Sequence, residues 1–161
     1  MKRLAAVMIV FGFVAARGAI AAPAPVATGP YDPALNGWKQ LEAAGATASA
    51  QGKRVLVVVG GNWCPWCRAL DREMTGDAAL RNEVAARFVL VHLNYSKENK
   101  NLEAMVRLGH PNTLGFPSFV VLSPTLKVLH LQGSGPFETG DQKKPGHDPA
   151  KLLAFFKQWE K

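Results

Sequence analysis

The most informative segment of the sequence runs Val55-Leu56-Val57-Val58-Val59-Gly60-Gly61-Asn62-Trp63-Cys64-Pro65-Trp66-Cys67. Its first five residues are apolar and mostly β-branched, which predicts a strand buried on both faces. Two glycines follow, and Pro65 suits the first position of a helix, where its missing N–H would have had no partner. The segment therefore predicts a strand that leads through a short turn into a helix beginning next to Cys64.

The chain has two cysteines, Cys64 and Cys67, and their spacing is typical of a redox pair. Residues i and i+3 are neighbours on one face of a helix, close enough for a disulfide. Unpaired N–H groups and the helix dipole favour a negative charge at the helix N-terminus, and the thiolate is the nucleophilic form of cysteine. We therefore expect Cys64 to be the more exposed, attacking thiol and Cys67 the resolving thiol one turn into the helix.

Other uses of a cysteine pair fit less well. A structural zinc site needs about four ligands, and no two of the four histidines lie three to five residues apart. Covalent haem attachment would need a histidine directly after the second cysteine, where the chain has Arg68. An inert disulfide remains open, but it would close only a short loop and so remove little entropy from the unfolded chain.

Together with Gly115-Phe116-Pro117-Ser118 and the apolar run that follows, this segment resembles the thioredoxin superfamily. The match is most similar to its secreted bacterial members, related to thiol:disulfide interchange proteins, and covers residues 35–159. It implies an α/β thioredoxin fold, a central mixed sheet flanked by helices. It also implies that Cys64 and Cys67 are the redox-active disulfide pair.

The resemblance extends to the residues around the pair. Trp63 matches the aromatic residue before the first cysteine, and Pro117 matches the cis-proline that faces the disulfide; X-Pro bonds adopt cis at low cost. Phe116 then offers its backbone to an extended substrate segment, and Trp63 and Trp66 supply an apolar rim. Phe116 is bulkier than the residues common at that position, which leaves substrate preference open.

A second departure concerns the proton of the resolving thiol. Many thioredoxins carry a buried acid six positions before the first cysteine, and this chain has Val58 there. A proton relay to Cys67 must then come from elsewhere or from water. The nearest acids in sequence are Asp71 and Glu73, which we interpret as a solvated helix face because acids are rarely buried without a partner.

The chain divides into three predicted parts. Residues 1–21 have the basic start, apolar run and small residues of a secretory signal peptide cleaved after Ala21, and the run is too short to span a bilayer. Residues 22–33 contain four prolines and predict a flexible N-terminal tether. Residues 34–161 form the thioredoxin-like domain. No cysteine near the cleavage site offers a lipid anchor, so we expect a mature protein without a membrane anchor, secreted across the inner membrane into the periplasm.

The charge pattern excludes one class of partner. The formal net charge of +7 falls to +4 without the three basic residues of the signal peptide, which contains no acid. The remaining basic residues are scattered and do not form a stripe interleaved with aromatic side chains. Nucleic-acid binding is therefore not indicated.

Within the domain, hydrophobic periodicity and turn residues predict alternating helices and strands. A long loop is expected over residues 133–146. The helices are predicted over residues 34–50, 65–74, 77–86, 102–108 and from Pro149 onward, and the strands over residues 55–59, 88–93, 119–122 and 128–131.

The sequence thus predicts a thiol:disulfide oxidoreductase acting on protein thiols and disulfides, with no organic cofactor and no metal. Its electrons would be exchanged with another protein, in our interpretation a membrane redox partner. The alternative is a thioredoxin-fold copper chaperone that holds Cu(I) through the same two thiols, aided by His110, because thiolates suit soft copper. A third interpretation is an interaction domain that keeps the fold without turnover.

Overall fold

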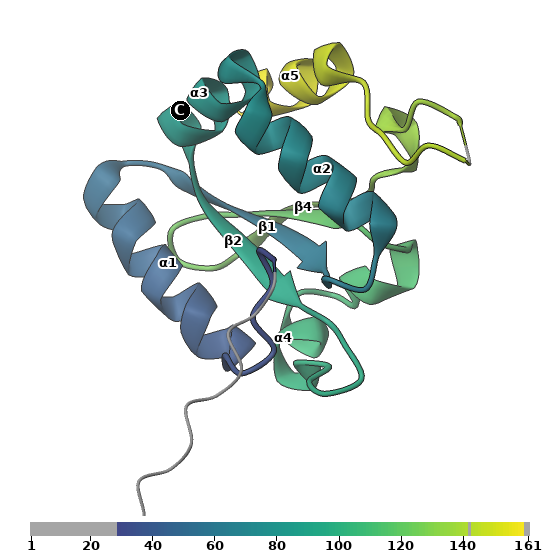
Figure 1. Cartoon of the computed structure of the whole chain (residues 1–161). Coiled ribbons are helices and arrows are strands. Elements are labelled where there is room, and N and C mark those ends of the chain that lie inside the picture. Colours follow the sequence, from purple (N-terminus) through teal and green to yellow (C-terminus); the bar gives the residue numbers. More distant parts are fainter. Residues whose placement is uncertain (1–28, 142, 160–161) are drawn as a thin grey trace, which may run out of the picture.

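The computed structural model describes residues 29–141 and 143–159, which form a mixed four-stranded sheet flanked by helices (Figure 1). The order in the sheet is β2-β1-β3-β4. Strand β1 pairs parallel with β2 and antiparallel with β3, and β3 pairs antiparallel with β4. The predicted thioredoxin fold is confirmed. The strands are β1 (Arg54–Gly60), β2 (Phe88–Asn94), β3 (Ser118–Leu122) and β4 (Val128–Gly133).

The helices cover both faces of the sheet, as Figure 1 shows. Buried residues of α1 and α4 pack in one cluster, and those of α2, α3 and α5 pack in the other. Each predicted helix is present, with ends shifted by a few residues. The helices are α1 (Gly37–Gln51), α2 (Pro65–Gly76), α3 (Ala78–Arg87), α4 (Leu102–Arg107) and α5 (Pro149–Lys157), with two short 3₁₀ helices, η1 (Pro111–Leu114) and η2 (Gly135–Phe137).

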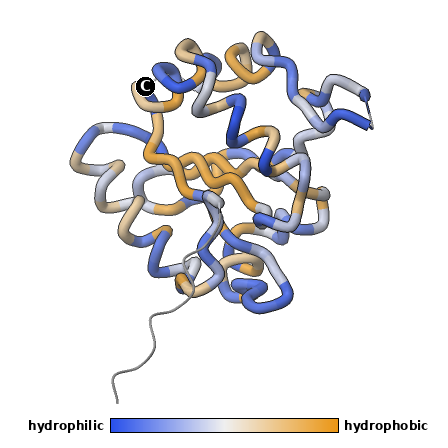
Figure 2. The backbone as a smooth tube through the Cα atoms, viewed as in Figure 1, coloured by the Kyte–Doolittle hydropathy of each residue, from blue (hydrophilic) through white to orange (hydrophobic). Residues whose placement is uncertain are grey.

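Strand β1 is the centre of the core, and its apolar run is visible in the middle of Figure 2. Leu56 and Val58 point into the cluster under α2, α3 and α5, whereas Val55, Val57 and Val59 point into the cluster under α1 and α4. All five side chains are at most 1% exposed. Because burial of apolar area is the main favourable term in folding, this strand fixes the position of the turn that follows it.

The N-terminal part of the described chain packs more closely than the sequence predicts. Tyr31 is fully buried in the cluster under α2. Its backbone N–H donates to Oδ1 of Asn62 (3.2 Å), and its carbonyl accepts from Nδ2 of the same residue (2.7 Å). The tether predicted over residues 22–33 therefore does not describe Tyr31, which belongs to the core.

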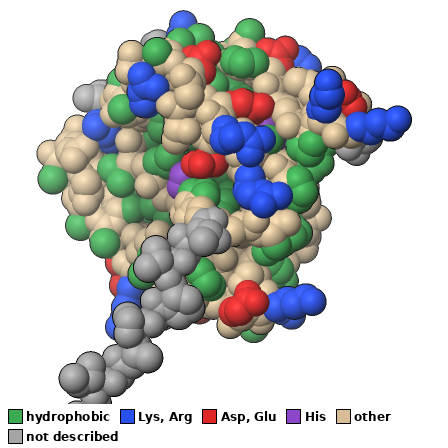
Figure 3. All heavy atoms as spheres, viewed as in Figure 1, with side chains coloured by type: hydrophobic (Ala, Val, Ile, Leu, Met, Phe, Trp, Pro, Cys, Tyr) green, Lys and Arg blue, Asp and Glu red, His purple; other side chains and the backbone are tan. Residues whose placement is uncertain are grey.

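The predicted signal peptide and residues 22–28 lie outside the described residues. Among the helices that the structure describes, none is long and apolar enough to cross a membrane. On the face shown in Figure 3, acidic and basic side chains are interspersed.

The part of the predicted loop over residues 133–146 that the structure describes is held by short-range contacts. It includes the end of β4 and the 3₁₀ helix η2. Glu138 and His147 form an isolated antiparallel bridge, and the N–H of Thr139 donates to the carbonyl of Gly146 at 2.9 Å. The two ends of the loop therefore lie side by side, and His147 lies next to α2.

Candidate redox site

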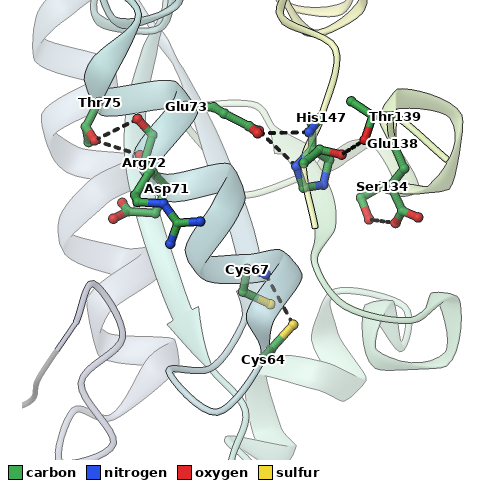
Figure 4. A network of polar contacts seen from close by, with 11 residues as sticks. Cys64, Cys67, Asp71, Arg72, Glu73, Thr75, Ser134, Glu138, Thr139 and His147 are labelled. Atoms are coloured by element: carbon green, nitrogen blue, oxygen red, sulfur yellow. Dashed lines mark hydrogen bonds and ion pairs between the residues drawn. The ribbon is translucent and has the colours of Figure 1, made fainter. Parts of the chain in front are cut away.

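The turn after β1 places both cysteines at the start of α2 (Figure 4). Cys64 is the N-cap residue and Pro65 follows it as the first helical residue. The Sγ atom of Cys64 accepts a hydrogen bond from the N–H of Cys67 at 3.2 Å, and both residues are free thiols. The predicted helix start is confirmed, and a thiolate at Cys64 would be held by a helix N-terminus.

The two thiols differ in their ionisation. The hydrogen bond from the Cys67 thiol is the main cause that lowers the pKa of Cys64 to about 7. Burial opposes this shift, whereas the N–H groups of Cys67 and Trp66 and the charge of Arg68 lower the pKa further. The same hydrogen bond, together with burial, raises the pKa of Cys67 far above the ordinary value. Cys64 is 3% exposed and Cys67 is fully buried. Cys64 is therefore the thiol that ionises near neutral pH.

The proline loop lies directly against this pair. The Phe116–Pro117 peptide bond is cis, Pro117 is buried and Phe116 is half-buried. The thiol of Cys64 donates to the carbonyl oxygen of Phe116 at 3.7 Å. The structure thus brings together Cys64, Cys67, Phe116 and Pro117, which the resemblance places in one site.

An aromatic cluster borders the site on one side. The ring of Phe116 lies 5.4 Å from that of Trp63 and 5.1 Å from that of Tyr95, measured between centroids. The indole N–H of Trp63 donates to the carbonyl of Tyr95 at 2.8 Å, yet 55% of Trp63 stays exposed. An open pocket of about 470 Å³ lies between Trp63 and the loop of residues 95–100. Tyr95 was not singled out from the sequence, because nothing in its local pattern shows that its loop reaches the proline loop.

Trp66 lies on the other side of the pair and is half-buried. Its ring contacts that of His147 edge to face, 5.8 Å between centroids. Glu73 holds His147 in place, with Oε1 accepting from the backbone N–H (2.9 Å) and Oε2 lying 3.0 Å from Nδ1 (Figure 4). The interpretation of Glu73 as part of a solvated face is wrong, because its carboxylate anchors the loop that packs on Trp66.

Asp71 also has a partner, so the same correction applies to it. Its Oδ1 lies 3.4 Å from Nε2 of His92 on β2. Burial lowers the pKa of His92, and the negative charge of Asp71 opposes that effect. His92 is the Cα partner of Val58 in the parallel register, and its ring contacts the ring of Tyr31 at 5.2 Å. A polar group thus lies beside Val58 on the neighbouring strand.

The described residues contain no group of three or more His, Cys, Asp or Glu side chains arranged to hold a metal ion. His110, considered as an aid to copper binding, is exposed at the start of η1.

Comparisons with known proteins agree with this geometry. The family model described as Thioredoxin-like matches residues 37–124. The chain belongs to the thioredoxin-like family. A solved structure described as a disulphide isomerase from Xylella fastidiosa Temecula1 is 29% identical, with a TM-score of 0.68, over 80% of this chain and 95% of that chain.

A second solved structure, the DsbD C-terminal domain of Neisseria meningitidis in the oxidised form, is 12% identical with a TM-score of 0.50, over 76% of this chain and 96% of that one. At that identity the likeness concerns the fold alone. No curated protein matches the chain. Membership of the thioredoxin-like family, with two adjacent thiols at a helix N-terminus, supports a general thiol–disulfide oxidoreductase.

Proposed function

We propose that this thioredoxin-like protein is a secreted thiol:disulfide oxidoreductase that exchanges disulfides with protein substrates in the periplasm. The observation that carries the proposal is the Cys64 thiol, whose pKa is lowered to about 7 and whose sulfur accepts the Cys67 N–H at the start of α2. A thiol with a pKa near the ambient pH is the most effective attacking group in disulfide exchange.

The reaction has two steps. The thiolate of Cys64 attacks one sulfur of a substrate disulfide, forming a mixed disulfide and releasing the other substrate sulfur as a thiolate. Cys67 then loses its proton and attacks Sγ of Cys64, so that the Cys64–Cys67 disulfide forms and the second substrate sulfur leaves and takes up a proton. The substrate is reduced by two electrons and the pair is oxidised; the reverse sequence oxidises a substrate dithiol.

A protein segment fits beside Cys64 better than a small thiol does. The Phe116 carbonyl, occupied in this structure by the Cys64 thiol, becomes free for a substrate N–H once Cys64 carries the mixed disulfide. The exposed ring of Trp63 and the adjacent pocket offer apolar contact. The chain matches 95% of the solved structure described as a disulphide isomerase. That likeness supports disulfide exchange on proteins. A membrane redox partner would then return the Cys64–Cys67 pair to its starting redox state.

Trapping tests the assignment of roles. The variant Cys67→Ala should accumulate a mixed disulfide through Cys64 with a disulfide-bonded peptide, detected by mass under non-reducing conditions. The matched variant Cys64→Ala should trap little, because the Cys67 thiol is buried and its pKa is raised. Equal trapping by the two variants would overturn the roles, and no trapping by either would overturn the function.

A further inference from the structure

The second step of the proposed reaction requires Cys67 to ionise in the core. Its side chain is fully buried, and its pKa is raised. The strand position that carries an acid in many thioredoxins is Val58, which is apolar and 1% exposed. Some other polar group must therefore lower the cost of the Cys67 thiolate, or resolution will be slow.

Tyr31 supplies such a group from outside the sheet. Its hydroxyl is buried and makes no well-formed hydrogen bond among the residues that the structure describes, yet it lies near enough to the Cys67 side chain to lower the pKa of that thiol. A buried hydroxyl without a well-formed hydrogen bond costs free energy, and a thiolate at Cys67 would give it a stronger acceptor than the thiol does. The ring belongs to the same apolar cluster as Val58 and both cysteines.

Gly60 shows that the hydroxyl faces the Cys67 sulfur. A Cβ atom built on Gly60 would lie 2.5 Å from Sγ of Cys67 and 3.0 Å from the hydroxyl oxygen of Tyr31. The two atoms therefore lie against the same point of the backbone, and the absence of a side chain at residue 60 leaves room for both. The Cβ atom of any other residue there would clash with the Cys67 sulfur.

The position of Tyr31 is fixed at both its backbone and its ring. Asn62, two residues before Cys64, clamps the backbone of Tyr31 with two hydrogen bonds. The ring packs against His92, which lies at ion-pair distance from Asp71. The loop that positions the cysteines thus also positions the tyrosine.

We propose that the Tyr31 hydroxyl donates a hydrogen bond to the sulfur of Cys67 as this thiol ionises, in the place of the acid absent at Val58. The inference rests on the proposed function and specifies how its second step is assisted. Tyr31 keeps its own proton throughout: the proton of Cys67 passes to water, and the departing substrate thiolate takes one up.

The titratable groups around Tyr31 indicate that its hydroxyl acts as a hydrogen-bond donor and not as a base. Burial is the main cause that raises the pKa of Tyr31. The charges of Cys67, Cys64 and Asp71 and the interaction of the hydroxyl with the Cys67 side chain raise it further. The hydroxyl therefore remains protonated at neutral pH. In the dithiol, the thiol of Cys67 is hydrogen-bonded to Cys64; once Cys64 carries a substrate, that bond is lost and the Tyr31 hydroxyl is the neighbouring donor.

The test separates the two chemical steps in time. The purified full chain, in its reduced form, is mixed in a stopped-flow instrument with a peptide disulfide whose two sulfurs carry a fluorophore and a quencher. Attack by Cys64 gives a phase whose rate depends on peptide concentration, and resolution by Cys67 gives a second phase that does not. Cys67→Ala identifies the second phase by removing it.

Tyr31→Phe keeps the ring and removes the donor. We expect the second phase to slow by about tenfold or more, with its pH profile moved to higher pH, while the first phase changes less than about twofold and the melting temperature does not fall. Thr47→Val, which removes an exposed hydroxyl bonded to the Ala43 carbonyl on α1, is the matched control and should leave both phases unchanged.

Each other outcome has a definite meaning. If Tyr31→Phe leaves the second phase unchanged, or slows both phases together with a loss of stability, the inference is overturned and the proposed function stands. If the wild-type protein shows no second phase that Cys67→Ala removes, the proposed function itself fails.

Discussion

The largest cause of the lowered pKa of Cys64 is a single side chain, that of Cys67, and can be tested by changing that side chain alone. The shift from an ordinary thiol value of about 8.5 to 9 down to about 7 corresponds to about 2 to 3 kcal/mol in favour of the thiolate. Its largest cause is the hydrogen bond from the Cys67 thiol, and the helix N–H groups come after it. Cys67→Ala removes the first cause and keeps the others that lower the pKa, which are the backbone N–H groups of residues 66 and 67 and the charge of Arg68.

We expect the pKa of Cys64 in Cys67→Ala to rise by about one unit, to about 8, because a hydrogen bond to a charged group contributes roughly 1.5 to 3 kcal/mol. Cys67→Ser keeps a side-chain donor and should stay nearer the wild-type value. The assay is thiolate absorbance together with the rate of alkylation as a function of pH. The midpoint of the profile is the quantity to compare, because the reactivity of a thiolate rises with its pKa and partly masks the change at a single pH.

The wild-type profile should show one transition near pH 7, since the raised pKa of Cys67 keeps that thiol protonated through the accessible range. Equal midpoints for the Ala and Ser variants, or a midpoint in Cys67→Ala at or below the wild-type value, would refute the assignment to the Cys67 side chain. The N–H groups of the helix N-terminus and the charge of Arg68 would then be the cause.

Three further predictions follow from the same region. The pKa of Cys64 in the folded protein lies below its unfolded value, so the contribution of its thiolate to the stability of the reduced protein is lost as pH falls through about 7. The free energy of unfolding of the wild type, compared with that of Cys64→Ser, should therefore rise by up to about 1.4 kcal/mol per pH unit between pH 7 and about 8.5. Urea titration measures this difference. Glu73→Gln should destabilise by about 1 to 3 kcal/mol and speed amide exchange at His147, because one charged partner of a buried ring is lost. Gly60→Ala should destabilise by about 1 to 3 kcal/mol or more by overpacking the adjacent sulfur, whereas Gly76→Ala, with nothing within 4 Å of the added atom, should be neutral or stabilising in the same thermal melt.

Much of the fold follows from local patterns. The apolar run of β1 predicts burial on both faces, and the alternation of helices and strands predicts a mixed sheet; both are confirmed. Asn36, Cys64, Asp77 and Asp148 each cap a helix with a side-chain atom. Such signals lie within a few residues of the element they define, which is why the predicted helices and strands fall so close to the observed ones.

The parts of the site that the sequence did not predict all depend on contacts between distant segments. Glu73 meets His147 across 74 residues, and Tyr31 meets Asn62 across 31. Asp71 and Glu73 have the spacing of an ordinary exposed helix face, and only the fold brings a histidine to each. Tyr31 lies in a proline-rich segment whose composition is typical of a tether, so neither its burial nor its neighbour could be read from local pattern.

These distant contacts give the two cysteines different environments on the two sides of one helical turn. Cys64 is set by groups that come with the motif itself, the N–H donors of its own helix and the thiol one turn later. Cys67 interacts with Cys64 as well, but it also contacts groups from elsewhere, the glycine at the end of β1 and the tyrosine from before α1. A substitution outside the Cys-Pro-Trp-Cys motif should therefore alter the resolving step more readily than the attacking step. Because the mixed disulfide lasts as long as Cys67 takes to resolve it, residues such as Tyr31 would set how long a substrate stays attached, and with it whether the protein completes a reduction or releases its substrate to rearrange.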